Sequence, residues 1–254
     1  MIPWYEHAFG REYLTLYPHR DDAEAERDVR SIIDLIAPDK DEPLLDLGCG
    51  AGRHLVALHR SGFTQLVGID LSADLLAVAR ERLDEIGADG VQLVRSDMRA
   101  IPYVARFATV VSLFTSFGYF TDTGDDGRVL SGVNRALKSG GTFLIDTLNR
   151  DRVIANLVPR EDKTLQDRVL HINRRLSADH TRVEKETRVI DEAGTEHVFR
   201  ESVRMYTAIE LEKMLRESGF EEVREYGSLR GESHRADSER LVIVAKKGTP
   251  TDLV

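Results

Sequence analysis

The stretch Leu44-Leu45-Asp46-Leu47-Gly48-Cys49-Gly50-Ala51-Gly52-Arg53-His54 sets the expectation for the whole chain. A short apolar run contains an acidic residue and then meets glycines at alternate positions, and an amphipathic pattern follows. This order is that of a buried parallel strand that enters a helix through a tight turn. Glycine lets the backbone turn sharply and approach a ligand closely, because no Cβ intervenes. The N-terminus of the following helix leaves unpaired N–H groups, which attract an anionic group such as a carboxylate.

Further strand patterns follow at regular intervals. Leu66–Asp70 predicts a second strand that ends in an acid, with Ser72 as the N-cap of the next helix. Gln92–Met98 repeats the strand-then-acid order, and Phe107–Phe120 contains a fourth strand. The segment Leu137-Lys138-Ser139-Gly140-Gly141 predicts a turn into a fifth strand. A carboxylate at such a strand end can accept both hydroxyls of a ribose.

The glycine-rich stretch and these further segments, in this order, resemble the class I S-adenosylmethionine-dependent methyltransferases, whose D-x-G-x-G-x-G pattern is met at every fixed position from Asp46 to Gly52. The resemblance implies S-adenosylmethionine as cofactor, S-adenosylhomocysteine as product, no metal, and in-line methyl transfer to N or O of a small molecule. A nicotinamide-dependent oxidoreductase is disfavoured, because the dinucleotide pattern G-x-G-x-x-G needs glycine at Arg53 and has no acid at Asp46. A cofactor-binding regulatory protein without catalysis is the second alternative.

The resemblance also assigns roles to individual residues. It gives a cofactor-binding role to Tyr17, Arg20, Asp46, Gly48, Cys49, Gly50, Gly52, Asp70, Leu71, Asp97, Met98 and Leu113. Among these, Arg20 would grip the cofactor carboxylate, Asp70 the ribose and Asp97 the adenine amino group. The acceptor is expected to face Thr115, Ser116, Tyr119 and Arg204. The chain is also similar to the glycine and sarcosine and the amino-sugar N-methyltransferases, which cover their site with an antiparallel sheet and an N-terminal aromatic segment.

The sequence does not identify a catalytic base. The positive sulfur of the cofactor already activates the methyl group, so the protein mainly has to align the reactants. A base is needed only where the acceptor must lose a proton. Tyr119, His19 and His171 are the candidates for that role. A lone histidine in a strand is more often a surface or core residue than a catalyst.

Composition narrows the class of protein. The chain has 254 residues, 41% hydrophobic and 31% charged, as in an ordinary soluble protein. No apolar run approaches the ~20 residues of a membrane span, and no signal-peptide layout opens the chain. A formal net charge of −9 disfavours nucleic acid as a partner. The single Cys49 excludes an intrachain disulfide, and we expect a cytoplasmic protein.

We therefore predict an α/β fold, namely a Rossmann-like seven-stranded doubly wound sheet with an inserted small antiparallel β subdomain. The expected units are an N-terminal aromatic segment and helix that form a lid, a cofactor-binding core, an antiparallel insertion over the active site, the C-terminal part of the core and a tail. Their bounds are 1–40, 41–150, 151–206, 207–248 and 249–254. Thr164–Met205 shows three candidate strands, and Thr207–Glu210 is a capping box that opens a helix. The alternative role of the insertion is a homodimer interface.

Overall fold

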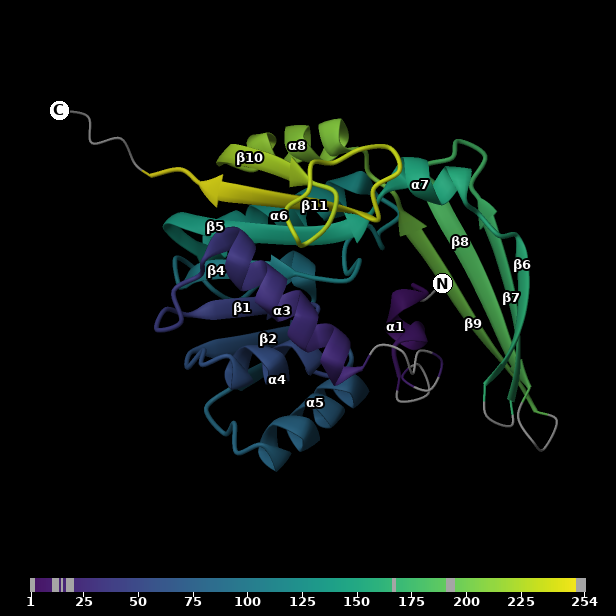
Figure 1. Cartoon of the computed structure of the whole chain (residues 1–254), viewed down its shortest axis with the longest axis horizontal. Coiled ribbons are helices and arrows are strands. Elements are labelled where there is room, and N and C mark those ends of the chain that lie inside the picture. Colours follow the sequence, from purple (N-terminus) through teal and green to yellow (C-terminus); the bar gives the residue numbers. More distant parts are fainter. Residues whose placement is uncertain are drawn as a thin grey trace.

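The chain is described by a computed structural model that covers residues 3–10, 14, 16, 21–165, 168–190 and 195–249. It contains two separate sheets (Figure 1). The first has seven strands in the order β10-β11-β5-β4-β1-β2-β3, and the second has four in the order β6-β7-β8-β9. The predicted α/β fold with an antiparallel insertion is confirmed.

The seven-stranded sheet is mostly parallel. Its strands are β1 (Leu44–Leu47), β2 (Leu66–Asp70), β3 (Gln92–Arg95), β4 (Phe107–Ser112), β5 (Leu137–Leu148), β10 (Phe220–Tyr226) and β11 (Arg240–Lys247). Strands β1 to β5 pair in parallel, whereas β11 is antiparallel to both β5 and β10. The carboxyl ends of the five parallel strands therefore meet at one edge of the sheet, where a ligand is expected.

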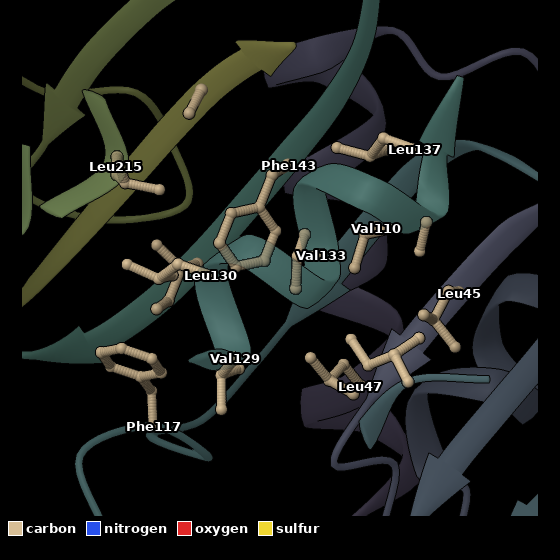
Figure 2. Packing of buried hydrophobic residues seen from close by; sticks show 14 of the residues in the cluster. Leu45, Leu47, Val110, Phe117, Val129, Leu130, Val133, Leu137, Phe143 and Leu215 are labelled. Carbon is tan, nitrogen blue, oxygen red and sulfur yellow. The ribbon is translucent and has the colours of Figure 1, made fainter. Parts of the chain in front are cut away.

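Helices cover both faces of this sheet. They are α3 (Asp22–Ile36), α4 (Arg53–Arg60) and α5 (Ala73–Glu85) on one face, and α6 (Thr123–Ala136) and α8 (Ala208–Glu217) on the other. Strand side chains alternate between the faces. Leu44 packs with α3 and α4, while Leu45 and Leu47 join the cluster of α6 and α8, which Figure 2 shows around Phe143 and Val133.

Local cap signals act as predicted. The Ser72 hydroxyl accepts a hydrogen bond from the Leu75 N–H at 3.2 Å and caps α5. Thr207 and Glu210 form the predicted capping box at the start of α8. These short-range bonds satisfy N–H groups that a helix start otherwise leaves open.

One expected turn is part of a strand. β5 runs without a break from Leu137, and the predicted turn at Gly140 and Gly141 is an irregularity within it. Gly140 has φ +72°, and the register against β4 shifts there. The extra residues bulge out of the sheet because glycine accepts this left-handed conformation.

The second sheet has four strands, namely the three predicted within Thr164–Met205 and one further strand before them. They are β6 (Arg160–Leu165), β7 (Arg168–Leu176), β8 (Arg182–Ile190) and β9 (Glu196–Arg204), and all neighbours are antiparallel. The missed strand is β6, whose sequence Arg-Glu-Asp-Lys-Thr-Leu carries no apolar alternation. The short helix α7 (Arg150–Ala155) leads from the core into this sheet.

A short N-terminal helix, α1 (Tyr5–Ala8), lies between the second sheet and the carboxyl edge of the first (Figure 1). It contacts β9. No helix in the described ranges combines the length and apolarity that crossing a membrane requires.

Candidate active site

A cavity of about 390 Å³ lies at the carboxyl ends of β1, β2 and β4. This volume falls within the range of small-molecule sites. Of the predicted residues, ten line the cavity: Gly48, Cys49, Gly50, Asp70, Leu71, Asp97, Met98, Leu113, Ser116 and Tyr119. Asp46, Gly52, Thr115, Arg204 and His171 are not part of its lining. Tyr17, His19 and Arg20 lie outside the described residues.

The glycines of the first loop serve different purposes. Gly48, Gly50 and Gly52 have φ of +81°, +52° and +74°. A Cβ on Gly48 would lie 2.7 Å from the Ser116 Cβ, and one on Gly52 would lie 2.9 Å from the Ala79 Cβ. These two glycines are therefore required by packing as well as by the turn. A Cβ on Gly50 would meet only Leu75, at 3.8 Å, so this backbone faces open space at the cavity.

Asp70, at the end of β2, is oriented by two backbone donors. Its Oδ2 accepts from the Gly50 N–H at 2.8 Å and its Oδ1 from the Ser72 N–H at 2.8 Å. Burial raises the pKa of the Asp70 carboxyl, and these hydrogen bonds oppose the rise. Each carboxylate oxygen keeps further acceptor capacity, so the group can receive two hydroxyls.

Asp46 lies beneath the loop rather than in the cavity wall. It is 1% exposed, and burial raises its pKa to about 6. Its Oδ2 has no hydrogen-bond partner among the described residues. Asp46 is therefore a buried acid whose charge interacts with those of His54, Asp70 and Arg53.

Asp97 is held in an ion-pair network. Its Oδ2 lies 2.6 Å from Nη2 of Arg99, whose Nη1 lies 2.9 Å from Oδ2 of Asp125. Burial alone would raise the pKa of Asp97, but the hydrogen bonds from Arg99 outweigh it and lower the pKa. Asp97 therefore remains an ionised acceptor at the cavity over the neutral pH range.

The chain after β4 is strained and clamped. Phe114 and Thr115 have φ of +58° and +65°, a conformation that side chains with a Cβ rarely adopt. Asp146 accepts from the Phe114 N–H at 2.9 Å and from Arg240 Nε at 2.6 Å. Arg240 also donates to the Thr115 hydroxyl at 2.6 Å. Thr115 thus belongs to the clamp, whereas its neighbour Ser116 reaches the cavity.

Aromatic rings form a further part of the cavity wall. The Tyr119 ring centroid lies 5.0 Å from that of Trp4, 5.6 Å from Phe9 and 6.4 Å from Tyr5. We call these four rings the aromatic cluster. Ser72 fastens the segment by donating its hydroxyl to the Phe9 carbonyl at 2.6 Å. The N-terminal segment therefore forms part of the wall itself, next to the turn that carries Asp70.

Two predicted residues stand elsewhere. His171 Nδ1 lies 2.8 Å from Asp162 Oδ1 on the exposed face of the second sheet, and the Arg204 guanidinium lies over the Tyr206 ring. No described residue of β6 to β9 lines the cavity. The second sheet instead stands behind α1 (Figure 1).

Sequence reasoning missed Arg53 as a wall residue. It is the first residue of α4, lines the cavity, pairs with Glu24 and lies 4.8 Å from the centroid of the Phe114 ring. Its position directly after Gly52 was the available signal, because a residue at the start of this helix has to stand beside the loop.

Comparison with known proteins agrees with this geometry. A family described as methyltransferase domain matches residues 44–141. The chain is 30% identical over 192 residues to dTDP-3-amino-3,4,6-trideoxy-alpha-D-glucopyranose N,N-dimethyltransferase from Streptomyces venezuelae, with 73% of this chain and 77% of that protein covered. The chain belongs to the S-adenosylmethionine-dependent methyltransferases.

Other methyltransferases match over most of their length. The glycine/sarcosine N-methyltransferase of Aphanothece halophytica is 25% identical over 215 residues, covering 80% of this chain and 76% of that protein. The CcbJ methyltransferase structure from Streptomyces caelestis superposes with a TM-score of 0.80 at 19% identity, covering 96% and 99% of the two chains. The S-adenosylmethionine-bound structure of CalS10, an amino pentose methyltransferase, gives 0.68 at 23% identity, covering 93% and 97%. These two likenesses support the fold.

The methyltransferase uses S-adenosylmethionine, and its cavity fits that cofactor. Asp70 offers an oriented carboxylate and Gly50 an open backbone, and Tyr5, Phe9 and Tyr119 of the aromatic cluster line the same cavity. Among the described residues, no group of three or more His, Cys, Asp or Glu is arranged to hold a metal ion.

Proposed function

We propose that this methyltransferase transfers the methyl group to the amino nitrogen of a small molecule such as an amino sugar. The observation that supports this is the wall around Tyr119. There the cavity is lined by Tyr5, Phe9, Phe120 and Ser116, and the nearby carboxylate of Asp97 is already engaged by Arg99, which lies over the Phe120 ring. A neutral amine needs no base before it attacks, whereas a hydroxyl does.

The aromatic faces also suit the product. Methylation of an amine gives an ammonium ion, which ring faces stabilise by about 0.5–2 kcal/mol. His54 of α4 is the one described imidazole in the cavity wall, and its Nε2 lies 3.2 Å from Oδ2 of Asp28 on α3. The named activities of relatives point the same way, since two matching Streptomyces enzymes are amino-sugar N,N-dimethyltransferases.

On this proposal one half of the cavity binds the cofactor and the other half binds the acceptor. Asp70 would receive the ribose hydroxyls, Asp97 and Met98 would hold the adenine, and the Leu113 carbonyl would meet the cofactor ammonium. When bound, S-adenosylmethionine supplies a methyl group activated by positive sulfur. The protein would align the acceptor at Ser116 and Tyr119 and keep water out, and alignment of this kind contributes up to ~7–11 kcal/mol.

The N-terminal segment would be the lid, and the second sheet its support. Tyr5 and Phe9 reach the cavity, whereas β9 touches α1 from behind. We propose a cytoplasmic enzyme whose binding partner is its small-molecule acceptor. The net charge of −9 disfavours nucleic acid as a partner. A homodimer through an edge of the second sheet is the alternative role of the insertion.

Labelled S-adenosylmethionine tests the acceptor. The enzyme is incubated with a dTDP-linked 3-amino sugar and, separately, with the matching 3-hydroxy sugar. Label on the amine and none on the alcohol supports the proposal. Label on the alcohol alone contradicts it. Binding of S-adenosylhomocysteine with no transfer to a panel of amines, hydroxy acids and sugars favours the regulatory alternative.

Replacing Asp70 with alanine tests the cofactor half. Asp70→Ala removes charge-assisted hydrogen bonds worth about 1.5–3 kcal/mol, so S-adenosylhomocysteine should bind roughly ten- to hundredfold more weakly by calorimetry. Asp74→Ala is the control, because Asp74 is an exposed acid on the same turn. Unchanged affinity in a folded Asp70→Ala protein would show that the ribose is held elsewhere.

A further inference from the structure

Arg182 joins the second sheet to the wall of the cavity. It is the first residue of β8, and its guanidinium is half-buried. Nη1 donates to the Phe120 carbonyl at 2.9 Å, and Nη2 lies 3.2 Å from the Tyr119 carbonyl and 3.3 Å from that of Gly118. One side chain thus binds three consecutive carbonyls of the chain after β4.

The same guanidinium is anchored on its own sheet. Nε donates to the Ser202 hydroxyl at 3.0 Å and Nη2 to the Ser202 carbonyl at 2.7 Å. The planar fork of an arginine carries five N–H donors in fixed directions. Two of them belong to Nη2, so its three carbonyl contacts share these two hydrogens. The position of the loop is therefore fixed relative to β9.

A second contact presses the loop against the sheet. The Arg204 N–H donates to the Gly118 carbonyl at 2.7 Å. Gly118 has φ +89°, and a Cβ there would lie 2.6 Å from the Arg204 carbonyl oxygen. The approach is so close that only glycine fits at this point.

The charge on Arg182 is secure. Burial lowers the pKa of its guanidinium, and the carboxylate of Asp126 on α6 opposes that shift. An arginine pKa starts so far above neutral that the group stays charged. The three carbonyls are therefore met by a charged donor, which strengthens each hydrogen bond.

We propose that Arg182 is a positioning residue for the acceptor side of the cavity. It holds the backbone of residues 118–120 from the second sheet and thereby sets where the Tyr119 ring stands. Tyr119 and Phe120 line the cavity, and Arg182 does not. This inference goes beyond the proposed amine acceptor, because it concerns only the shape of the wall.

Three variants test the proposal. Arg182→Met keeps the apolar stem and removes every donor, and Arg182→Lys keeps the charge with fewer directed donors. Arg174→Gln is the control, because Arg174 is a partly buried arginine of the same sheet that bonds Glu161 and the Val158 carbonyl instead of the loop.

The readouts report on the loop directly. Trp4 is the single tryptophan, and its ring centroid lies 5.0 Å from that of Tyr119, so its fluorescence senses the position of that ring. Hydrogen exchange of residues 117–121 reports backbone opening. In Arg182→Met this exchange should rise by at least about tenfold and the Trp4 emission should shift. Affinity for S-adenosylhomocysteine should stay within about threefold, and turnover of an amine substrate should fall by about a hundredfold.

Arg182→Lys should lie between Arg182→Met and the native protein, and Arg174→Gln should match the native protein. Equal exchange and equal Trp4 emission in Arg182→Met and Arg174→Gln would overturn the proposal. If Arg182→Met unfolds, Arg182→Lys decides, since native exchange and emission in that folded variant would overturn it as well. If the amine proposal is wrong, the native enzyme does not turn over the amine. The comparison of hydrogen exchange between the variants still tests the role of Arg182 in that case.

Discussion

Strand β1 of the central sheet is buried along its whole length, whereas β6 of the second sheet has no buried residue. The contrast extends to the rest of both sheets. The central sheet lies between two large apolar clusters, one of which contains Leu47, Phe143 and Leu215 (Figure 2). The second sheet has one small cluster, built around Leu170, Ile172, Val189 and Leu16.

Charge replaces apolar packing on the second sheet. Lys185 pairs with Glu201 at 3.0 Å across β8 and β9, and Arg174 pairs with Glu161 at 2.8 Å across β6 and β7. Partly exposed ion pairs add little net free energy. The central sheet therefore carries the stability of the fold, while the second sheet depends on what it leans against. We expect it to open locally well before the core unfolds.

Removing the second sheet gives the largest expected effect. An even number of antiparallel strands returns the chain to the end where it began, and three strand spacings separate β6 from β9 by about 14 Å. A short Gly-Ser linker can therefore replace residues 160–204. Methyl transfer should fall by at least about 10³-fold, because the N-terminal wall and the 118–120 loop lose their support.

Binding of S-adenosylhomocysteine should stay within about tenfold in that variant, since no described residue of β6 to β9 lines the cavity. Labelled-methyl assays and calorimetry measure the two quantities. Full turnover in a folded variant would refute the supporting role. A change from dimer to monomer with turnover kept would favour the interface role.

A matched pair of phenylalanines measures the difference in packing. Phe143 is 1% exposed and lies 5.8 Å from the Phe220 ring, whereas Phe199 of β9 is only partly buried. Phe143→Ala should cost about 3–5 kcal/mol of unfolding free energy, through lost burial and a cavity. Phe199→Ala should cost about 1–2 kcal/mol. Urea denaturation gives both values, and equal losses would contradict the contrast between the sheets.

The same contrast explains what the sequence could predict. Core strands such as β2 can be predicted from their apolar runs. Helix starts can be predicted from Ser72 and Thr207, whose side chains accept hydrogen bonds from N–H groups within the next few residues. Those are local signals. β6 carries none, since its strand conformation comes from pairing with β7 rather than from its own residues.

The parts of the site that escaped prediction are held by distant partners. Thr115 was expected to face the acceptor, but its hydroxyl accepts from Arg240, 125 residues away. The carbonyl of Tyr119 is bonded by Arg182, 63 residues away. A single arginine in a strand pattern gives no sign of such a bond. The glycine loop was predictable because its backbone turn is a local constraint, whereas the packing of Gly48 on Ser116 and of Gly52 on Ala79 was not.

Acid titration should reveal the joint between the two sheets. Asp126 on α6 is buried and accepts from the Tyr206 hydroxyl, which follows β9, at 2.6 Å. Burial raises its pKa from 3.8 to about 6, against the opposing pull of Tyr206, Arg182 and Arg204. The native state thus binds a proton that the unfolded state has lost between about pH 4 and pH 6. Across that window this group makes the unfolding free energy fall as pH rises.

Asp126→Asn removes this contribution of Asp126 to the pH dependence of the unfolding free energy. The stability of the variant relative to the native protein should therefore improve from pH 4 to pH 7 by at most about 3 kcal/mol. Urea denaturation at both pH values measures it, and the same comparison cancels the contribution of Asp46. A difference that stays constant with pH would show that Asp126 does not titrate in this window.

The smallest effect is expected on the outer face of the second sheet. Arg175 of β7 pairs with Glu184 of β8 at 2.6 Å, and the Arg175 side chain is 81% exposed. Water screens such a pair, and ordering two long side chains offsets most of the attraction. Arg175→Ala should change the unfolding free energy by at most about 0.5 kcal/mol and leave methyl transfer unchanged.

Lys185→Ala is the informative contrast, because Lys185 and Glu201 are only 18% and 19% exposed and face each other across β8 and β9. Its loss leaves a partly buried carboxylate behind, so it should cost more than Arg175→Ala in the same urea titration. If the exposed pair proves the costlier one, surface ion pairs contribute more to this sheet than its few apolar contacts do, and the ranking of the two sheets has to be revised.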